Sequence, residues 1–152
     1  MNIVVITQAR LGSTRLPNKV LKKIGNKTLL EIHIGRIRKA KKINNIIVVT
    51  TDNKEDELIC QQMHNIGVSV FRGSENDVLD RFYQSVKLDK PELIVRLTSD
   101  CPLIDPELID SMIDETIRSN VDYCSNTLSE TFPDGQDIEI FTFKALEKAW
   151  RL

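Results

Sequence analysis

The chain has 152 residues, of which 41% are hydrophobic and 28% are charged, and its formal net charge is -1 at neutral pH. This length and composition predict a single globular domain and exclude a disordered chain. The balanced charge excludes a general nucleic-acid-binding protein, whose domain would carry a strongly basic face. No apolar run has the length of a membrane span, and no secretory leader precedes the first strand pattern.

Three cysteines lie far apart in the sequence, at Cys60, Cys101 and Cys124. No two of them have CxxC spacing, so neither a disulfide framework nor a zinc site is indicated. We interpret them as small hydrophobic residues of a protein in a reducing compartment, and we expect a cytoplasmic location.

Apolar, β-branched runs alternate with helical patterns through most of the chain. Strands are expected at 3–6, 46–50, 68–71 and 93–97, and helices at 28–41, 53–66, 74–86 and 105–117. Four strand–helix units predict an α/β fold, with helices on both faces of a mainly parallel sheet and right-handed crossovers.

Polar residues at the helix starts and apolar residues at helical spacing complete this prediction. The expected N-caps of the second, third and fourth helices are Asp52 or Asn53, Ser74, and Asp105. Pro106, at the first helical position, strengthens the prediction that Asp105 is a cap. The expected core faces of the four helices are Leu30, Ile34 and Ile37; Leu58, Ile59, Met63 and Ile66; Val78, Leu79, Phe82 and Val86; and Leu108, Ile109, Met112, Ile113 and Ile117.

The pattern changes after Asn120. A short strand is expected at 121–125, and the alternation over 137–141 predicts a half-exposed strand at or beyond the sheet edge. A helix begins near Phe143 and is still running at Leu152. We therefore expect that residues 1–152 form one domain that is truncated at its C-terminus.

The loop from Thr7 to Lys19 follows the first strand and carries Arg10, Arg15 and Lys19 without an acidic residue. Such a loop at a strand end predicts binding of a multiply charged anion, although a solvated connection has similar loop residues. Neither GxGxxG nor GxxxxGK[ST] is present, so neither glycine-based phosphate loop applies. Side-chain cations and backbone N–H groups would hold the phosphates, and Gly12 permits close backbone approach.

Three segments are expected to meet at the carboxyl ends of the parallel strands: 7–19, 72–77 and 98–105. Asp100, at the end of the fourth strand, is a candidate Mg²⁺ ligand, because Mg²⁺ usually takes one or two carboxylates together with water and phosphate oxygens. The alternative interpretation is that Asp100 caps a turn.

Other reactive side chains are interpreted as structural. His33 and His64 lie in expected helices without Cys or Asp at ligand spacing. Ser13 and Thr14 have no paired base and are not expected to act as nucleophiles.

Four segments together resemble one enzyme family: ARLGSTRLPNKVL (9–21), ENDVLDRF (75–82), RLTSDCPLIDPELID (96–110) and TFPDGQDIEIF (131–141). The chain resembles the cytidylyltransferases that activate 3-deoxy-manno-octulosonate and acylneuraminate sugars, and within them the spore coat polysaccharide biosynthesis group. The resemblance implies a three-layer αβα nucleotide-diphospho-sugar transferase fold and transfer of CMP from CTP to a sugar, with Mg²⁺ as cofactor and pyrophosphate as product.

The resemblance also implies roles for individual residues. Arg15, Lys19 and Asp100 are implied as catalytic residues, and Asp100 also as the magnesium ligand. The implied nucleotide-binding residues are Ala9, Arg10, Leu11, Gly12, Ser13, Arg15, Lys19, Arg72 and Asp77.

Two departures from the family pattern qualify the resemblance. Ser99 stands where relatives often have glycine, and relatives continue past residue 152. That continuation is expected to supply sugar contacts, a second metal carboxylate and part of a homodimer interface. Two alternatives therefore stay open, a non-catalytic nucleotide-binding domain and a glycosyltransferase, although the SDC sequence at 99–101 lacks the second aspartate of a DxD motif.

Overall fold

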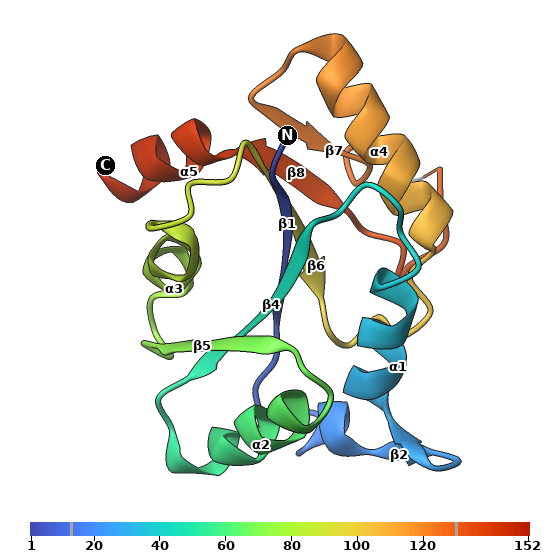
Figure 1. Ribbon diagram of the computed structural model, residues 1–152. Coiled ribbons are helices and arrows are strands. Elements are labelled where there is room, and N and C mark those ends of the chain that lie inside the picture. Colours follow the sequence, from blue (N-terminus) through green and yellow to red (C-terminus); the bar gives the residue numbers. More distant parts are fainter. Residues whose placement is uncertain (13, 130) are drawn as a thin grey trace.

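A six-stranded sheet with the order β5-β4-β1-β6-β8-β7 forms the centre of the molecule (Figure 1). The computed structural model describes residues 1–12, 14–129 and 131–152. The strands are β1 (Ile3–Gln8), β4 (Asn45–Thr51), β5 (Ser69–Gly73), β6 (Leu93–Thr98), β7 (Tyr123–Ser125) and β8 (Glu139–Thr142), with β2 (Lys23–Ile24) and β3 (Lys27–Thr28) as a separate hairpin. The helices are α1 (Leu29–Ile37), α2 (Glu57–Asn65), α3 (Val78–Val86), α4 (Pro106–Ser119) and α5 (Phe143–Trp150), with 3₁₀ turns η1 (Lys19–Leu21) and η2 (Lys54–Asp56).

Helices cover both faces of the sheet, which confirms the expected three-layer αβα architecture. Ile3 and Val5 of β1 join a core cluster with α1, α2 and α4. Val4 and Ile6 point the other way and join the core beneath α3 and α5. Alternate residues of a strand face opposite sides of the sheet, so this central strand contributes to both cores.

The parallel part of the sheet follows the sequence prediction closely. β1 pairs in parallel with β4 on one side and with β6 on the other, and β4 pairs in parallel with β5. The predicted start of α4 is confirmed, because the Asp105 side chain accepts the Glu107 N–H and Pro106 opens the helix.

Helix α1 is shorter than predicted. It begins after a capping box formed by Thr28 and Glu31, and it ends at Ile37 rather than continuing to Lys41. The carboxylate of Asp110 on α4 accepts the N–H groups of Lys41 and Lys42 at 2.9–3.0 Å. These amides bond to α4 instead of to a further helical turn.

Four expected core positions and two expected caps are wrong. Helix α2 begins at Glu57, and Asn53 precedes only the 3₁₀ turn η2, without a side-chain cap bond. Leu58 is 53% exposed, and Val78, Leu79 and Ile117 also lie at the surface. Helix α3 is capped by Asp77, whose carboxylate accepts the Asp80 N–H at 2.8 Å. The hydroxyl of Ser74 instead accepts the N–H groups of Asn76 and Asp77 in the preceding turn, so the helix begins later than Ser74.

The last strand was expected at or beyond the sheet edge, and this is wrong. β8 lies inside the sheet, antiparallel to both β6 and β7. Its alternating pattern is nevertheless consistent with this position: Ile138 and Ile140 are buried, whereas Glu139 is paired with Arg96 and accepts the Tyr123 hydroxyl.

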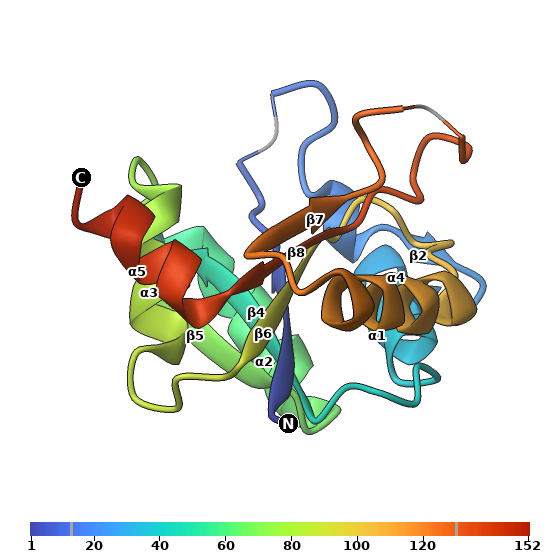
Figure 2. The same ribbon diagram turned by 90° about the horizontal axis from the view of Figure 1, so that it is seen from above.

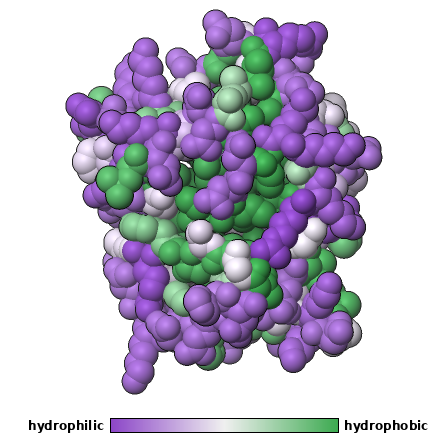
Figure 3. Space-filling view, viewed as in Figure 1, coloured by the Kyte–Doolittle hydropathy of each residue, from purple (hydrophilic) through white to green (hydrophobic). Residues whose placement is uncertain are grey.

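The surface in Figure 3 is largely hydrophilic around its rim, and hydrophobic side chains appear mainly in the middle of this face. No helix in the described ranges has the length and apolar character needed to cross a membrane.

His33 is structural, as the sequence indicated. It is fully buried in α1, where its Nδ1–H donates to the Cys101 carbonyl at 2.9 Å and its Nε2 contacts the Thr7 hydroxyl at 3.0 Å. Because a carbonyl can only accept, Nδ1 carries the proton and neutral Nε2 accepts from Thr7. Burial lowers the pKa of His33, and the Cys101 carbonyl and the nearby charge of Asp100 only partly offset this effect.

His33 should therefore make folding sensitive to mild acid. Below about pH 6.5 the unfolded chain protonates this imidazole while the folded chain keeps it neutral, so the free energy of unfolding falls by up to about 1.4 kcal/mol per pH unit. Urea unfolding between pH 7.5 and pH 5 should show this slope in the wild type and a shallower one in His33→Gln. The exposed His64 provides the control His64→Gln, which should keep the wild-type slope; identical slopes in all three proteins would refute the assignment.

Candidate functional site

A cleft of about 320 Å³ lies at the carboxyl ends of β1 and β6. In Figure 2 the loop after β1 rises from this edge of the sheet, on the side away from the N-terminus. The residues that line the cleft are Gln8, Ala9, Arg10, Thr14, Arg15, Lys19, Val20, Arg81, Thr98, Ser99 and Asp100. The first loop, the end of β6 and helix α3 thus meet at one site, as the topology of an open parallel sheet predicts.

An ion pair joins the two sides of the cleft. The ammonium of Lys19 donates to the Asp100 carboxylate at 2.9 Å, and both side chains are partly exposed. Burial would raise the pKa of Asp100, but the hydrogen bond and the charge of Lys19 outweigh it and hold that pKa below its ordinary value. Asp100 is therefore ionised at neutral pH and available to bind a cation.

Ser99, beside Asp100, ties β6 to β1. Its buried hydroxyl donates to the Gln8 carbonyl at 2.6 Å. The serine that departs from the family pattern thus fixes the strand end from which Asp100 projects.

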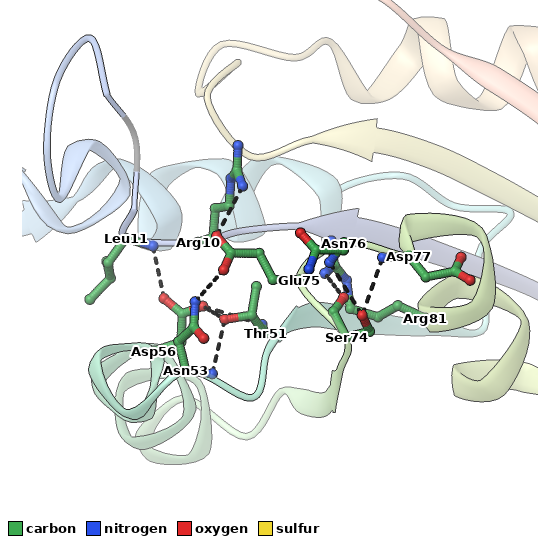
Figure 4. A network of polar contacts seen from close by, with 10 residues as sticks. All are labelled: Arg10, Leu11, Thr51, Asn53, Asp56, Ser74, Glu75, Asn76, Asp77 and Arg81. Carbon is green, nitrogen blue, oxygen red and sulfur yellow. Dashed lines mark hydrogen bonds and ion pairs between the residues drawn. The ribbon is translucent and has the colours of Figure 1, made fainter.

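The buried carboxylate of Asp56 anchors the first loop (Figure 4). It accepts the Leu11 N–H at 2.8 Å and the N–H of Thr51 at 3.2 Å, and it also accepts the Thr51 hydroxyl. The Asn18 N–H closes the loop by donating to the Leu11 carbonyl at 3.2 Å. The cationic segment is therefore held at its base by η2 and β4. Asp56 is not among the predicted site residues.

Arg10 has a counter-charge that the sequence did not suggest. Its guanidinium donates to Glu75 at 3.3 Å, and Asn53 donates to the other oxygen of that carboxylate at 2.8 Å (Figure 4). The pair is exposed, so it contributes little to stability and can exchange for another anion at small cost.

The structure brings together Ala9, Arg10, Arg15, Lys19 and Asp100 from the predicted site. Leu11 is buried beneath the cleft and Gly12 follows it in the loop. Ser13 lies outside the described residues.

Arg72 and Asp77 do not line the cleft within the described parts of the chain. Arg72 donates to the carbonyls of Thr51 and Asn53 and pairs with Glu57, and it faces a separate, larger concavity of about 800 Å³ beside α2 and β5. Asp77 caps α3. Contact of Arg72 and Asp77 with a nucleotide stays a prediction.

Arg81 also lines the cleft, although it is not among the predicted site residues. Its side chain, on α3, is only 3% exposed, and its Nη1 donates to the Ser74 carbonyl at 2.6 Å (Figure 4). Burial and the neighbouring Arg10 lower its pKa. One feature of the sequence could have indicated it: Arg81 stands next to Phe82 in the apolar stripe of a predicted helix. Cations are rare at such buried positions, so one there suggests a functional role.

The donors fit a magnesium ion that is shared with a phosphate chain. Asp100 is a partly exposed, ionised carboxylate on one wall, and cations for the phosphates stand on the other. No group of three or more potential ligand side chains occurs among the residues that the structure describes. Mg²⁺ bound by one carboxylate keeps several water and substrate oxygens, so a single aspartate suits it.

Loss of the Asp56 carboxylate should loosen the first loop. Asp56→Ala leaves the Leu11 and Thr51 donors buried without an acceptor, which should reduce the free energy of unfolding by roughly 3 kcal/mol. Urea unfolding measures this loss, and hydrogen exchange should show faster exchange of the Leu11 amide. The exposed neighbour Glu55 gives the control Glu55→Gln, and equal stability of the two variants would contradict the anchoring role.

Comparisons with known proteins show the family to which the chain belongs. The family model described as cytidylyltransferase matches residues 4–152. An uncharacterised protein of Methanocaldococcus jannaschii is 49% identical over 99% of this chain and 61% of its own length. The spore coat polysaccharide biosynthesis protein SpsF of Bacillus subtilis is 43% identical over 80% of this chain and 52% of its own length.

Among solved structures, a cytidylyltransferase from Leptospira borgpetersenii superimposes with a TM-score of 0.94 at 39% identity, covering all of this chain and 65% of that one. The nucleotide-diphospho-sugar transferase fold is thereby confirmed. The chain spans about half to two thirds of the length of these relatives. From its first strand to its last residue, the chain belongs to the cytidylyltransferase family.

Proposed function

We propose that this chain carries the CTP-binding and phosphate-activating part of a sugar cytidylyltransferase that acts in surface polysaccharide synthesis. The observation that carries the proposal is the ion pair of Lys19 and Asp100 across a cleft that Arg10 and Arg15 also line. Cations on one wall and a carboxylate on the other match the two needs of a magnesium nucleoside triphosphate. The polysaccharide role rests on the name of the Bacillus relative.

The proposed reaction is in-line attack by a sugar hydroxyl on the α-phosphorus of CTP. A new bond joins the sugar oxygen to that phosphorus as the hydroxyl proton passes to water, the bond between the α-phosphorus and the bridging oxygen breaks, and pyrophosphate leaves. No covalent enzyme intermediate is required, so the protein contributes positioning and stabilisation of phosphoryl charge.

Lys19 and Asp100 would exchange partners when the substrate binds. The lysine ammonium would bind a phosphate oxygen, and the freed carboxylate of Asp100 would hold Mg²⁺, which would supply neutralisation of phosphate charge. Lys19 would then act at the α-phosphate, and the arginines at the β- and γ-phosphates and the departing pyrophosphate. Arginine suits that role because its planar fork binds two oxygens at once.

Arg10 would also release Glu75 when it binds phosphate. Their ion pair is exposed and therefore weak, so exchanging Glu75 for a phosphate costs little free energy. A non-catalytic nucleotide-binding domain would bind CTP in the same way, and only turnover separates it from an enzyme.

A thermal-shift series tests the binding part of this proposal. CTP with Mg²⁺ should raise the melting temperature more than UTP, ATP or GTP, because a ligand that binds only the folded state stabilises it. Omitting Mg²⁺ should reduce the shift. Absence of a shift with all four nucleotides would refute the proposal.

Turnover tests the chemical part. In a form of the protein that turns over CTP, Lys19→Ala and Asp100→Asn should each lower pyrophosphate release by roughly 10²–10³-fold, as for loss of one transition-state contact. The exposed Lys22, just beyond η1, gives the control Lys22→Ala, which should keep the wild-type rate. Near-wild-type release by either test variant, with unchanged melting temperature, would remove that residue from the mechanism.

A further inference from the structure

We infer that the β2–β3 hairpin is a docking surface for anionic lipid bilayers. The surface consists of Lys22, just before β2, and of Lys23, Ile24 and Lys27 within the two strands. None of these residues belongs to the described lining of the cleft, so the docking surface is separate from the proposed reaction and does not depend on it. Its charge, its exposure and the geometry of its backbone each fit a bilayer.

Basic residues are concentrated in one stretch of a chain whose net charge is only -1. Ten of the 21 lysines and arginines lie in residues 15–42, together with a single acid, Glu31. Some of these cations are engaged: Arg36 donates to a backbone carbonyl at 2.6 Å, and Lys42 pairs with Asp114 at 2.8 Å. The ammonium groups of the three hairpin lysines, in contrast, make no ion pair or hydrogen bond with any described residue. Their charge is therefore available to a partner.

The hairpin projects from the molecule and is exposed throughout. Residues 22–27 are all exposed, and in Figure 1 they form the corner beside the β2 label, away from the six-stranded sheet. Ile24 is 63% exposed. A single exposed aliphatic side chain is ordinary on a protein surface, but this one lies among three lysines at the end of a projection. The corner therefore presents an apolar side chain surrounded by cations to any surface that approaches it.

The backbone holds this projection in a fixed shape. Ile24 pairs with Lys27 across a two-residue turn, and Gly25 opens that turn with a φ of 63°, as a tight hairpin requires. Directly paired residues share one face of an antiparallel ladder, so the side chains of Ile24 and Lys27 point the same way. At the base, the Lys22 carbonyl accepts the Leu29 N–H at 2.9 Å, where α1 begins. Because the hairpin is already ordered, docking costs little conformational entropy.

An anionic bilayer matches this combination of side chains. The ammonium groups meet the lipid phosphates, and each lysine near such a membrane strengthens binding by about 5-fold, while the isoleucine enters the boundary between head groups and acyl chains. A nucleic acid is bound more often through arginine forks or aromatic stacking, and residues 22–27 contain neither arginine nor an aromatic ring. Lysine together with an exposed aliphatic side chain therefore favours a bilayer over a nucleic acid.

The test is co-sedimentation of this chain with vesicles made of phosphatidylcholine and phosphatidylglycerol in equal parts. At low salt the wild type should bind these vesicles but not vesicles of phosphatidylcholine alone, and added salt should weaken binding because it screens exposed charges. Replacing all three hairpin lysines, in Lys22→Gln/Lys23→Gln/Lys27→Gln, should weaken binding about 100-fold. Ile24→Ser should weaken it about 10-fold, whereas Ile24→Leu, which keeps an aliphatic side chain, should bind as the wild type does.

A matched control removes the same charge from another part of the surface. Lys87→Gln/Lys144→Gln/Lys148→Gln changes three exposed lysines and should bind the vesicles as the wild type does. Failure of the wild type to bind anionic vesicles, equal weakening in the two triple variants, or unchanged binding in Ile24→Ser would overturn the inference. Tighter binding of the wild type to single-stranded RNA than to the vesicles would also overturn it and assign the hairpin to a nucleic acid. The thermal shift with CTP reports on the cleft alone, so none of these outcomes bears on the proposed function.

Discussion

The parallel pairing of β1 with β6 is the contact on which the cleft depends. Its register places Gln8 beside Thr98, although these residues are far apart in the chain. Lys19 and Asp100 each follow one of these strands, so the pairing brings a cation and a carboxylate within 2.9 Å of each other. The hydroxyl of Ser99 reinforces the junction by donating to the Gln8 carbonyl. Burial of both strands between two helical layers makes this register costly to change, because a slip would expose one core face.

Polar groups beneath the surface then give the site its shape. Asp56 of η2 fixes the base of the cationic loop, and Arg81 extends from α3 with its stem against Gly73. The site therefore uses elements on both faces of the sheet. Neighbouring helices and strands position these groups, and the loop itself supplies the exposed cations. This division explains why the loop's residues are easy to recognise in the sequence, whereas its supports are not.

Much of the fold followed from local pattern. Buried parallel strands appear in the sequence as apolar, β-branched runs, and Asp105 followed by Pro106 indicates the start of a helix. Predictions failed where a distant group decided the outcome. The carboxylate of Asp110 accepts the amides of Lys41 and Lys42 where α1 ends earlier than predicted. Strand β8 lies inside the sheet because β7 pairs with its outer edge. The burial of Arg81 was signalled only by its place next to Phe82 in an apolar helical stripe. Burial of an arginine depends on what surrounds it, and the spacing of neighbouring apolar residues does not specify that.

The pairing of Lys19 with Asp100 also affects the order of events in the cleft. A metal ion that arrives alone must displace an ammonium from the carboxylate and leave that ammonium uncompensated, and a nucleotide that arrives alone must leave the carboxylate facing its phosphates. In the proposed function, the magnesium–nucleotide complex would avoid both penalties because it supplies opposite charges together. The cleft would then favour the preformed complex over either component alone, and its charge balance would hardly change on binding.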